Sequence, residues 1–496
     1  PSGRTEKGAT PLTERADIPA PERGLVRGIG LWQATALNVT MIVGAGVFVT
    51  IPLMLRELPG PYALLPWLAA GLLILIDSLI WSELGAALPG SGGSYHFLLE
   101  AYGRNRWGRL MAFLFIWQFL ISGPLELGSG LVALAQFSTS LTPEVAAFNA
   151  EYSWTWEWLR WEERPGEEVT LGMKFEPARV FAVLVGLVII GLLYRNITTL
   201  GRLTVLIWLG VVGTIAWILV EGMLRFDPAI AFDCSGQAAA LPDGFAGKLG
   251  AGMILAIYSY LGYYNICYVG DEVRDPGRNV PRAILLSAAL VIVLFVGLHL
   301  AMMGTVSWRT VPQTQAGLEN FSLPAKFMQH IHGSWATTLV TVLLMWCCFG
   351  SAFAGLLGYS RIPYGAARNG HFFAVFARVH PGERIPHFSL LLVGGLMLFW
   401  TFFDLQTIIN ALIVTRIIEQ FLGQVVGVMI LRHRRPDLYR PYKMWLYPLP
   451  CLLALVGWLY VYVSSGWLYI MLGLGTLASG VVAFLIWSKH QRRSLT

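Results

Sequence analysis

The sequence predicts an all-α polytopic membrane protein with twelve transmembrane helices. Of its 496 residues, 55% are hydrophobic and only 13% are charged, against about 25% charged residues in an ordinary soluble domain. The apolar residues gather in twelve runs, and a helix that spans a bilayer needs roughly 20 such residues. This composition excludes a soluble enzyme and a disordered chain. The runs are also too long and too uniformly apolar for the strands of a membrane β-barrel.

Short polar segments separate the twelve runs. The runs lie at residues 31–56, 62–87, 107–138, 178–194, 203–223, 248–270, 283–305, 334–360, 386–403, 405–430, 445–464 and 466–487. Residues 1–30 are polar and contain four prolines, so we expect a disordered N-terminal tail there. Residues 488–496 form a short C-terminal tail. An even number of spans places both tails on the same side of the membrane.

The lysines and arginines predict which side that is. Of the 35 basic residues, 25 lie in the tails and in the segments on the same side as the tails, nine lie on the opposite side, and Arg416 lies within a run. Because basic residues favour the cytoplasmic side, we expect both termini in the cytoplasm. The net charge of +6 therefore reflects topology, and we expect no nucleic-acid partner.

The longest predicted external loop covers residues 141–176. It holds eight glutamates and four tryptophans: Trp154, Trp156, Trp158 and Trp161. Since tryptophan favours the membrane–water interface, we expect an interfacial belt or a loop helix on the membrane surface. An acidic surface that attracts cationic solutes to the external mouth is the alternative.

Two of the runs are interrupted in matching positions. The first is broken at residues 43–48 (VGAGVF), where two glycines weaken the helix by about 1 kcal/mol each. The sixth is polar and aromatic at its middle, residues 257–265 (IYSYLGYYN), and leads directly into the charged stretch 271–282. Close packing through small residues would also explain a GxG pattern. Paired interruptions in corresponding spans, however, indicate a transporter binding site.

Unwound helices can bind both charges of a zwitterion. The free N–H groups at a half-helix N-terminus favour an anion, and the free carbonyls at a half-helix C-terminus suit an ammonium group or a metal cation. An amino acid carries both an anionic and a cationic group.

The sequence resembles the amino acid–polyamine–organocation (APC) superfamily of secondary transporters. Four motifs carry the resemblance, in order along the chain: residues 43–48, 83–95 (ELGAALPGSGGSY), 271–284 (DEVRDPGRNVPRAI) and 435–443 (RPDLYRPYK). The resemblance implies a LeuT-type fold, which is a 5+5 inverted repeat plus two C-terminal helices. The repeats would be residues 31–223 and 248–430, and the two trailing helices would lie in 445–487.

The resemblance also implies where a substrate would bind. Its carboxylate would meet the backbone amides of Gly44, Ala45 and Gly46. Its amine would meet carbonyls near Met41 and Ile42 and around Tyr258 and Leu261. Tyr258 would also be an aromatic gate, and Tyr260 and Tyr264 would shape selectivity, with Tyr264 one turn beyond Tyr258 and facing the substrate side chain. These residues are Met41, Ile42, Gly44, Ala45, Gly46, Tyr258, Tyr260, Leu261 and Tyr264.

Ionisable residues within the runs are costly and are therefore functional candidates. Glu126, after Pro124 in the third run, could pair a substrate ammonium or take up a proton; a structural hydrogen bond to the chain freed by Pro124 is the alternative. Arg416 and Glu419 lie three residues apart, which places them on one helix face. We expect a structural ion pair between them, with a cytoplasmic gating pair as the alternative.

Four further positions are candidates of lesser specificity. Asp77 lies in the second run and is expected to hydrogen-bond neighbouring helices. The motif match suggests an inner-gate role for Glu83 with the basic loops. Gly350 and Ser351 could contribute to a sodium site in such a fold, although they are also ordinary packing residues.

The expected function is secondary active transport of amino acids by alternating access, in the plasma membrane, or in the inner membrane if the protein is bacterial. The alternatives are a polyamine or organic-cation transporter that uses Glu126, and a solute sensor that does not transport. H⁺ and Na⁺ are both candidate coupling ions. The sequence has no nucleophile elbow, HExxH or Walker motif, so we expect no enzyme activity, no cofactor and no metal site.

Overall fold

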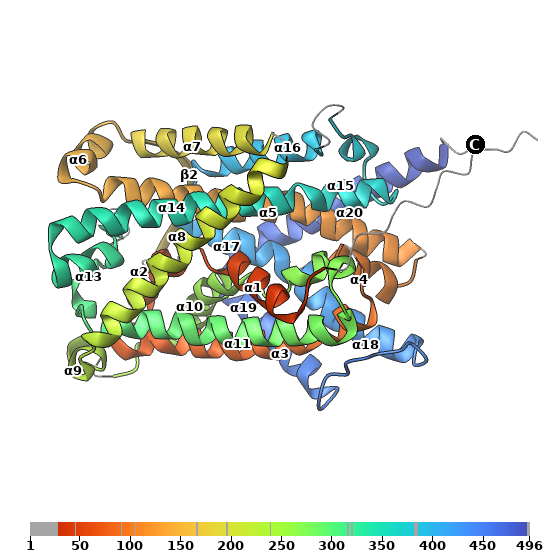
Figure 1. The fold of residues 1–496 in the computed structure, drawn as a ribbon, viewed down its shortest axis with the longest axis horizontal. Coiled ribbons are helices and arrows are strands. Elements are labelled where there is room, and N and C mark those ends of the chain that lie inside the picture. The colour runs from red at the N-terminus through yellow and green to blue at the C-terminus, as the bar shows by residue number, and fades with distance from the viewer. Residues whose placement is uncertain are drawn as a thin grey trace, which may run out of the picture.

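The computed structural model describes residues 28–493, except 45, 91, 105, 165–166, 195–196, 239, 315–316, 319–320 and 381–384. Long helices run side by side and form one bundle (Figure 1). Nearly all of the predicted disordered tail at 1–30 lies outside the described residues, and so does Ala45 of the predicted substrate site.

Many of the predicted runs form helices suited to a bilayer. Among the described residues, six spans are long and apolar enough to cross: α3 (Leu64–Ala87) with the short η1 (Gly60–Ala63), α5 (Arg106–Thr139), α11 (Pro276–Met303), α14 (Ser334–Tyr359), α17–α18 (Leu405–Arg434) and α20 (Trp467–Arg493). α1 (Leu31–Ile42) and α2 (Gly46–Glu57) are long and apolar enough only together, as a bent pair that would make a seventh span if it crosses. Shorter apolar helices are α7 (Pro177–Leu193), α16 (His387–Trp400), α19 (Leu449–Ser464) and the second half of α8 (Ile197–Leu224). The chain is a multi-pass membrane protein.

Short elements connect the spans at the two ends of the bundle. α6 (Pro143–Glu151), α9 (Pro228–Ala231) and α13 (Leu323–His332) lie at one end, and α4 (Ser94–Ala101) and α15 (Arg361–Arg368) lie toward the other (Figure 1). The sixth run begins as α10 (Phe245–Tyr260) and continues after a break as the 3₁₀ turns η3 (Asn265–Tyr268) and η4 (Gly270–Glu272). Further 3₁₀ turns are η2 (Gly236–Ala238), η5 (Trp308–Thr310) and η6 (Ala374–Ala377).

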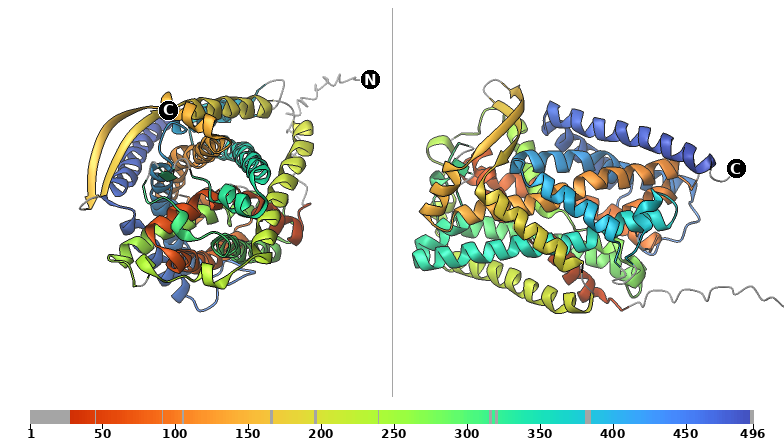
Figure 2. Two further views of the ribbon diagram at one scale, coloured as in Figure 1. Left: turned by 90° about the vertical axis from the view of Figure 1, so that its left-hand side faces the viewer. Right: turned by 90° about the horizontal axis from the view of Figure 1, so that it is seen from above.

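The tryptophan-rich loop begins with the helix α6, but its four tryptophans lie on a strand and not on a loop helix. After α6, it forms an antiparallel hairpin of β1 (Trp154–Arg164) and β2 (Glu167–Phe175), which lies beside α20 (Figure 2). Trp154, Trp156 and Trp158 alternate with other residues, and this period of two together with aromatic content favours a strand over a helix. Trp158 packs against Phe403, with ring centroids 5.8 Å apart.

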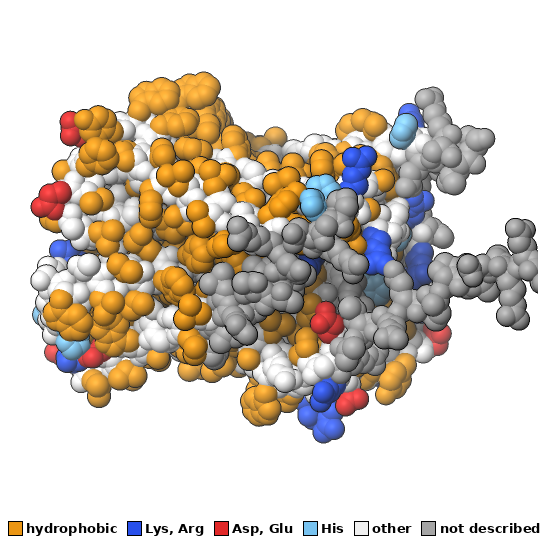
Figure 3. All heavy atoms as spheres, turned by 45° about the horizontal axis from the view of Figure 1, so that its top comes forward, with side chains coloured by type: hydrophobic (Ala, Val, Ile, Leu, Met, Phe, Trp, Pro, Cys, Tyr) orange, Lys and Arg blue, Asp and Glu red, His pale blue; other side chains and the backbone are white. Residues whose placement is uncertain are grey.

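The surface is apolar where a soluble protein would be polar. Exposed hydrophobic side chains cover the middle of the bundle, and charged side chains gather toward its two ends (Figure 3). On α7, for example, Leu184, Leu187 and Val188 are each half exposed. Such a belt has to be covered by lipid, because exposed apolar patches of this extent are rare on soluble monomers.

Candidate functional site

The first helix break is where the double glycine predicts it. α1 ends at Ile42 and α2 begins at Gly46, and the two helix axes are bent by 52°. A Cβ atom on Gly44 would lie 3.1 Å from the Cβ atom of Ser351, and one on Gly46 would lie 3.3 Å from Cε1 of Tyr258. The glycines therefore allow this backbone to approach α14 and α10 closely.

The second break lies opposite, at the end of α10. Leu261 leaves the helical conformation (φ −54°, ψ 141°), and Gly262 adopts a positive φ of 107°. The unwound backbone is satisfied by the buried Asn38 of α1. Its Nδ2 donates to the carbonyl of Tyr263 at 2.5 Å, and its Oδ1 accepts from the amide of Ile266 at 2.9 Å. Asn38 thus ties the two interrupted helices together.

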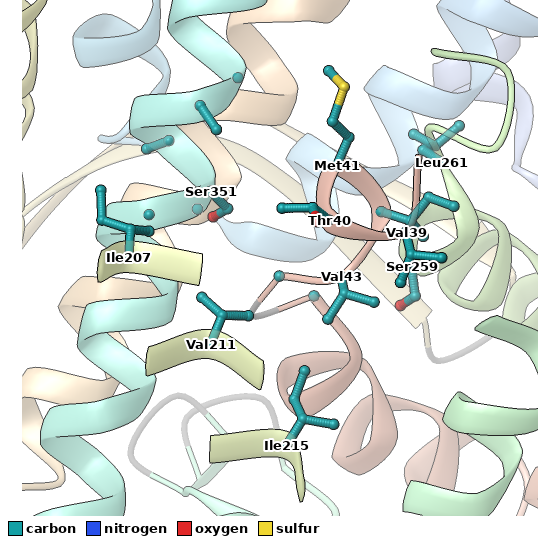
Figure 4. A pocket seen from close by; sticks show the side chains of 18 of the residues that line it. Val39, Thr40, Met41, Val43, Ile207, Val211, Ile215, Ser259, Leu261 and Ser351 are labelled. Atoms are coloured by element: carbon teal, nitrogen blue, oxygen red, sulfur yellow. The ribbon is translucent and has the colours of Figure 1, made fainter. Parts of the chain in front are cut away.

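A cavity of about 360 Å³ lies between the two breaks. Nine of the predicted site residues line it: Met41, Ile42, Gly44, Gly46, Glu126, Tyr258, Leu261, Gly350 and Ser351. Ser351 and Thr40 point toward one another across it, and Ile207, Val211 and Ile215 of α8 form an apolar side (Figure 4). The structure therefore brings most of the predicted residues to one cavity.

Tyr260 and Tyr264 do not line this cavity, contrary to the expectation. The hydroxyl of Tyr260 donates to the carbonyl of Trp67 at 3.3 Å, and its ring stacks on Phe295. Tyr264 stacks on Trp81, with ring centroids 4.4 Å apart. Tyr260 is still in α10 but lies two residues from Tyr258, on a different face of the helix. Tyr264 lies beyond the end of α10, where helical spacing no longer determines which way a side chain faces.

Tyr258 is held in place by the third predicted span. Its hydroxyl and that of Ser129 on α5 form a hydrogen bond of 2.7 Å, and Ser129 donates to the carbonyl of Glu126 at 2.5 Å. The ring is thereby fixed beside Gly46. Ser129 was not among the expected site residues, because a serine in a membrane helix is common and carries no spacing signal.

Glu126 pairs with Arg416, and this corrects the expected pairing of Arg416 with Glu419. The guanidinium lies 2.6 Å from the carboxylate, Ser122 accepts from its Nε at 3.1 Å, and Tyr359 donates to Glu126 at 2.8 Å. The reason is local. α17 (Leu405–Arg416) is followed by the π-helix η7 (Ile417–Leu422) and then α18 (Gly423–Arg434). A π turn is wider than an α turn, so residues three apart diverge.

Glu419 lies elsewhere on this helix. It is buried at 2% exposure, and Tyr462 of α19 is one of its electrostatic neighbours. It does not line the cavity.

Glu83 is part of a separate charged cluster. Its carboxylate accepts from Arg432 at 2.7 and 2.5 Å and from the amide of Met444 at 2.9 Å, and Arg440 lies 3.4 Å away. These contacts tie α3 to the end of α18 and to the segment that follows it. Asp77, as expected, hydrogen-bonds neighbouring elements, through Tyr263 and Trp458.

Metal-binding side chains do not gather anywhere in the described part of the chain: no group of three or more histidines, cysteines or acidic residues lies together there. All five cysteines are free; Cys234 is exposed and the other four are buried.

Comparison with known proteins identifies similar chains. Residues 29–487 match the family model described as amino acid permease. The human cystine/glutamate transporter is 25% identical over 98% of this chain and 91% of its own length. The human large neutral amino acids transporter small subunit 2 is 27% identical over 93% of this chain and 80% of its own length. The serine/threonine exchanger SteT of Bacillus subtilis is 25% identical over 90% of this chain and 92% of its own length.

Proposed function

The chain belongs to the amino acid permease family, within the APC superfamily, and on that premise we propose that it is a secondary transporter that moves amino acids by alternating access. In this proposal the bundle has twelve spans arranged as a LeuT-type 5+5 inverted repeat, residues 31–223 and 248–430, plus two helices in 445–487. The relatives named above are amino acid transporters and exchangers, not enzymes.

The observation that carries the proposal is the meeting of two broken helices at one cavity. The first amides of α2, at and after Gly46, have no partner within the helix and present the positive end of its dipole. The substrate carboxylate would bind there and, as the resemblance implies, at the amides of Gly44 and Ala45. The carbonyls of Met41 and Ile42 lie at the end of α1, and those of Tyr258 and Leu261 lie at the end of α10, where an ammonium is favoured.

The cavity favours an amino acid with a neutral side chain. Its volume of about 360 Å³ is at the small end of ligand pockets. Ile207, Val211 and Ile215 provide an apolar wall. Glu126 is the one charged residue among the described residues that line it, and Arg416 already compensates that charge. A polyamine would have to compete with the guanidinium for this carboxylate.

The remaining predicted residues have roles at the edges of the site. The cluster of Glu83 with Arg432 and Arg440 would close the side that the basic residues assign to the cytoplasm, where both termini lie. Gly350 and Ser351 would serve a Na⁺ site if Na⁺ is the coupling ion; H⁺ is the other candidate. The protein would act in the plasma membrane, or in the inner membrane of a bacterium.

Counterflow in proteoliposomes tests the proposal. Purified protein is reconstituted with unlabelled leucine or serine inside, and uptake of the labelled amino acid is followed, with putrescine and neutral amino acids as competitors. We expect counterflow that neutral amino acids inhibit and putrescine does not. Putrescine transport without amino acid transport would support the polyamine alternative. Amino acid binding without counterflow would indicate a sensor.

A further inference from the structure

Asp77 is a buried carboxyl group at the junction of three elements. It lies on α3 with 1% of its surface exposed. Its Oδ2 accepts from the hydroxyl of Tyr263 at 2.5 Å and from Nε1 of Trp81 at 2.8 Å, and its Oδ1 accepts from Nε1 of Trp458 at 3.3 Å. Trp81 belongs to α3 itself, Tyr263 to the break after α10, and Trp458 to α19.

All three donors are neutral, and no basic residue forms an ion pair with Asp77 among the described side chains. An ionised carboxyl in a membrane-spanning bundle is costly unless its hydrogen bonds and charge are satisfied. Three hydrogen bonds from neutral groups offset part of that cost. The charged state of Asp77 thus depends on its keeping these donors.

Four ionisable groups on the elements that pack against α3 are engaged elsewhere or are uncharged. On α11, His299 accepts from Trp67, several turns away from Asp77 along α3. On α10, Tyr260 also bonds Trp67. On α18, Arg432 is held by Glu83, and on α19, Cys451 is a buried thiol. These groups leave the three donors to determine whether the carboxyl holds its proton.

Of the three donors, Tyr263 is the one that lies in the unwound segment next to the substrate cavity. It follows Gly262 in the unwound segment, and its carbonyl accepts the hydrogen bond from Asn38. Leu261, two residues earlier, lines the cavity. A movement of this segment when substrate binds or when the cavity changes its side of opening would carry the Tyr263 hydroxyl with it. The two indoles lie on helices that continue past them on both sides.

We propose that Asp77 is a proton-binding site, and a positioning residue for the unwound segment, whose occupancy depends on the hydrogen bond from Tyr263. The carboxyl is ionised while Tyr263 donates to it. When the segment moves and the hydroxyl withdraws, the carboxylate accepts a proton from water, and it releases that proton when the hydroxyl returns. No covalent bond to substrate forms or breaks. The inference rests on the proposed function, since it assigns the proton as the coupled ion.

The transport test follows labelled amino acid exchange in proteoliposomes between pH 5 and 8 for four proteins. Wild type should show a rate that depends on pH. Asp77→Asn, which cannot exchange a proton, should lose that dependence while still exchanging amino acid. Tyr263→Phe removes a donor to the carboxylate, so the midpoint should move by about one pH unit to higher pH. The matched control is Tyr260→Phe, whose hydroxyl bonds Trp67 instead; its midpoint should equal that of wild type.

Infrared spectroscopy measures the protonation of the carboxyl group without requiring transport. Difference spectra of the purified protein with and without amino acid should show a change in a protonated carboxyl band, and Asp77→Asn should lack it. The proposal remains testable if Asp77→Asn fails to fold, because Tyr263→Phe should shift the pH at which the carboxyl band appears.

The possible failures are distinguishable. If wild type exchanges amino acid, and if Asp77→Asn and Tyr263→Phe both keep the pH profile and the infrared band of wild type, the Asp77 proposal is wrong and the proposed function stands. If wild type neither binds nor exchanges any amino acid tested, the proposed function is wrong.

Discussion

The guanidinium of Arg416 lies 2.6 Å from the carboxylate of Glu126 and joins α17 to α5 at the edge of the cavity. Arg416 is almost fully buried, at 1% exposure, whereas Glu126 faces the cavity. Tyr359 donates to the same carboxylate. The buried guanidinium of Arg416 therefore depends on Glu126 for charge compensation, while the Glu126 carboxylate remains within reach of a substrate in the cavity.

Replacing Glu126 by Gln should destabilise the protein and change its preference for cations. The variant leaves the Arg416 charge buried without its counter-charge, at a cost of about 3 kcal/mol. Thermal unfolding of the purified variant measures this loss, and competition by neutral amino acids and putrescine measures selectivity. Adding Arg416→Met to Glu126→Gln should recover most of the stability. Equal stability and selectivity in wild type and Glu126→Gln would show that the ion pair has neither role.

Gly46→Leu should abolish amino acid binding. A side chain at this position meets the ring of Tyr258, which Ser129 holds in place, so it would fill the space beside the first amides of α2. Binding is measured by the rise in unfolding temperature that amino acids cause. Gly395→Leu is the matched control, because a Cβ atom there has nothing within 4 Å. Normal amino acid binding by Gly46→Leu would refute the assigned carboxylate site.

The sequence predicted the backbone features of this site better than its side chains. The pair of glycines around residue 45 and the polar stretch 257–265 located both breaks, since glycine and helix-breaking patterns act locally. Tyr264 and Glu419 were assigned by helical spacing, and each lies beyond a change of helix geometry that shifts the phase. The π-helix that begins directly after Arg416 and contains Glu419 has no local signature. Hydrogen bonds such as that of Asn38 with Tyr263 join residues 225 apart, which no single sequence reveals.

Lowering the pH should destabilise the loop that follows α9. Arg309 forms an ion pair and hydrogen bond with Asp233 and, with Ser235, holds the pKa of that carboxyl well below its ordinary value. A lowered pKa in the folded state means that the stabilisation is present above the ordinary value near 4 and declines as the pH falls below it. Hydrogen exchange of residues 228–238, corrected for intrinsic rates, should show less protection at pH 3 than at pH 6. Asp233→Asn should be equally unprotected at both, whereas Asp243→Asn, at an exposed position nearby, should behave as wild type.

Asn38→Ala should impair transport by releasing the second helix break from the first. The substitution removes the partner of the Tyr263 carbonyl and of the Ile266 amide, both at the buried break. Each buried backbone group left unpaired costs about 1–3 kcal/mol, so we expect a lower unfolding temperature and weaker amino acid binding together. Thr35→Ala is the control on the same helix, because its hydroxyl bonds only the carbonyl of Leu31 within α1. If Asn38→Ala retained the stability and affinity of wild type, water would have to replace both hydrogen bonds, and Asn38 would not be needed to couple the two helices.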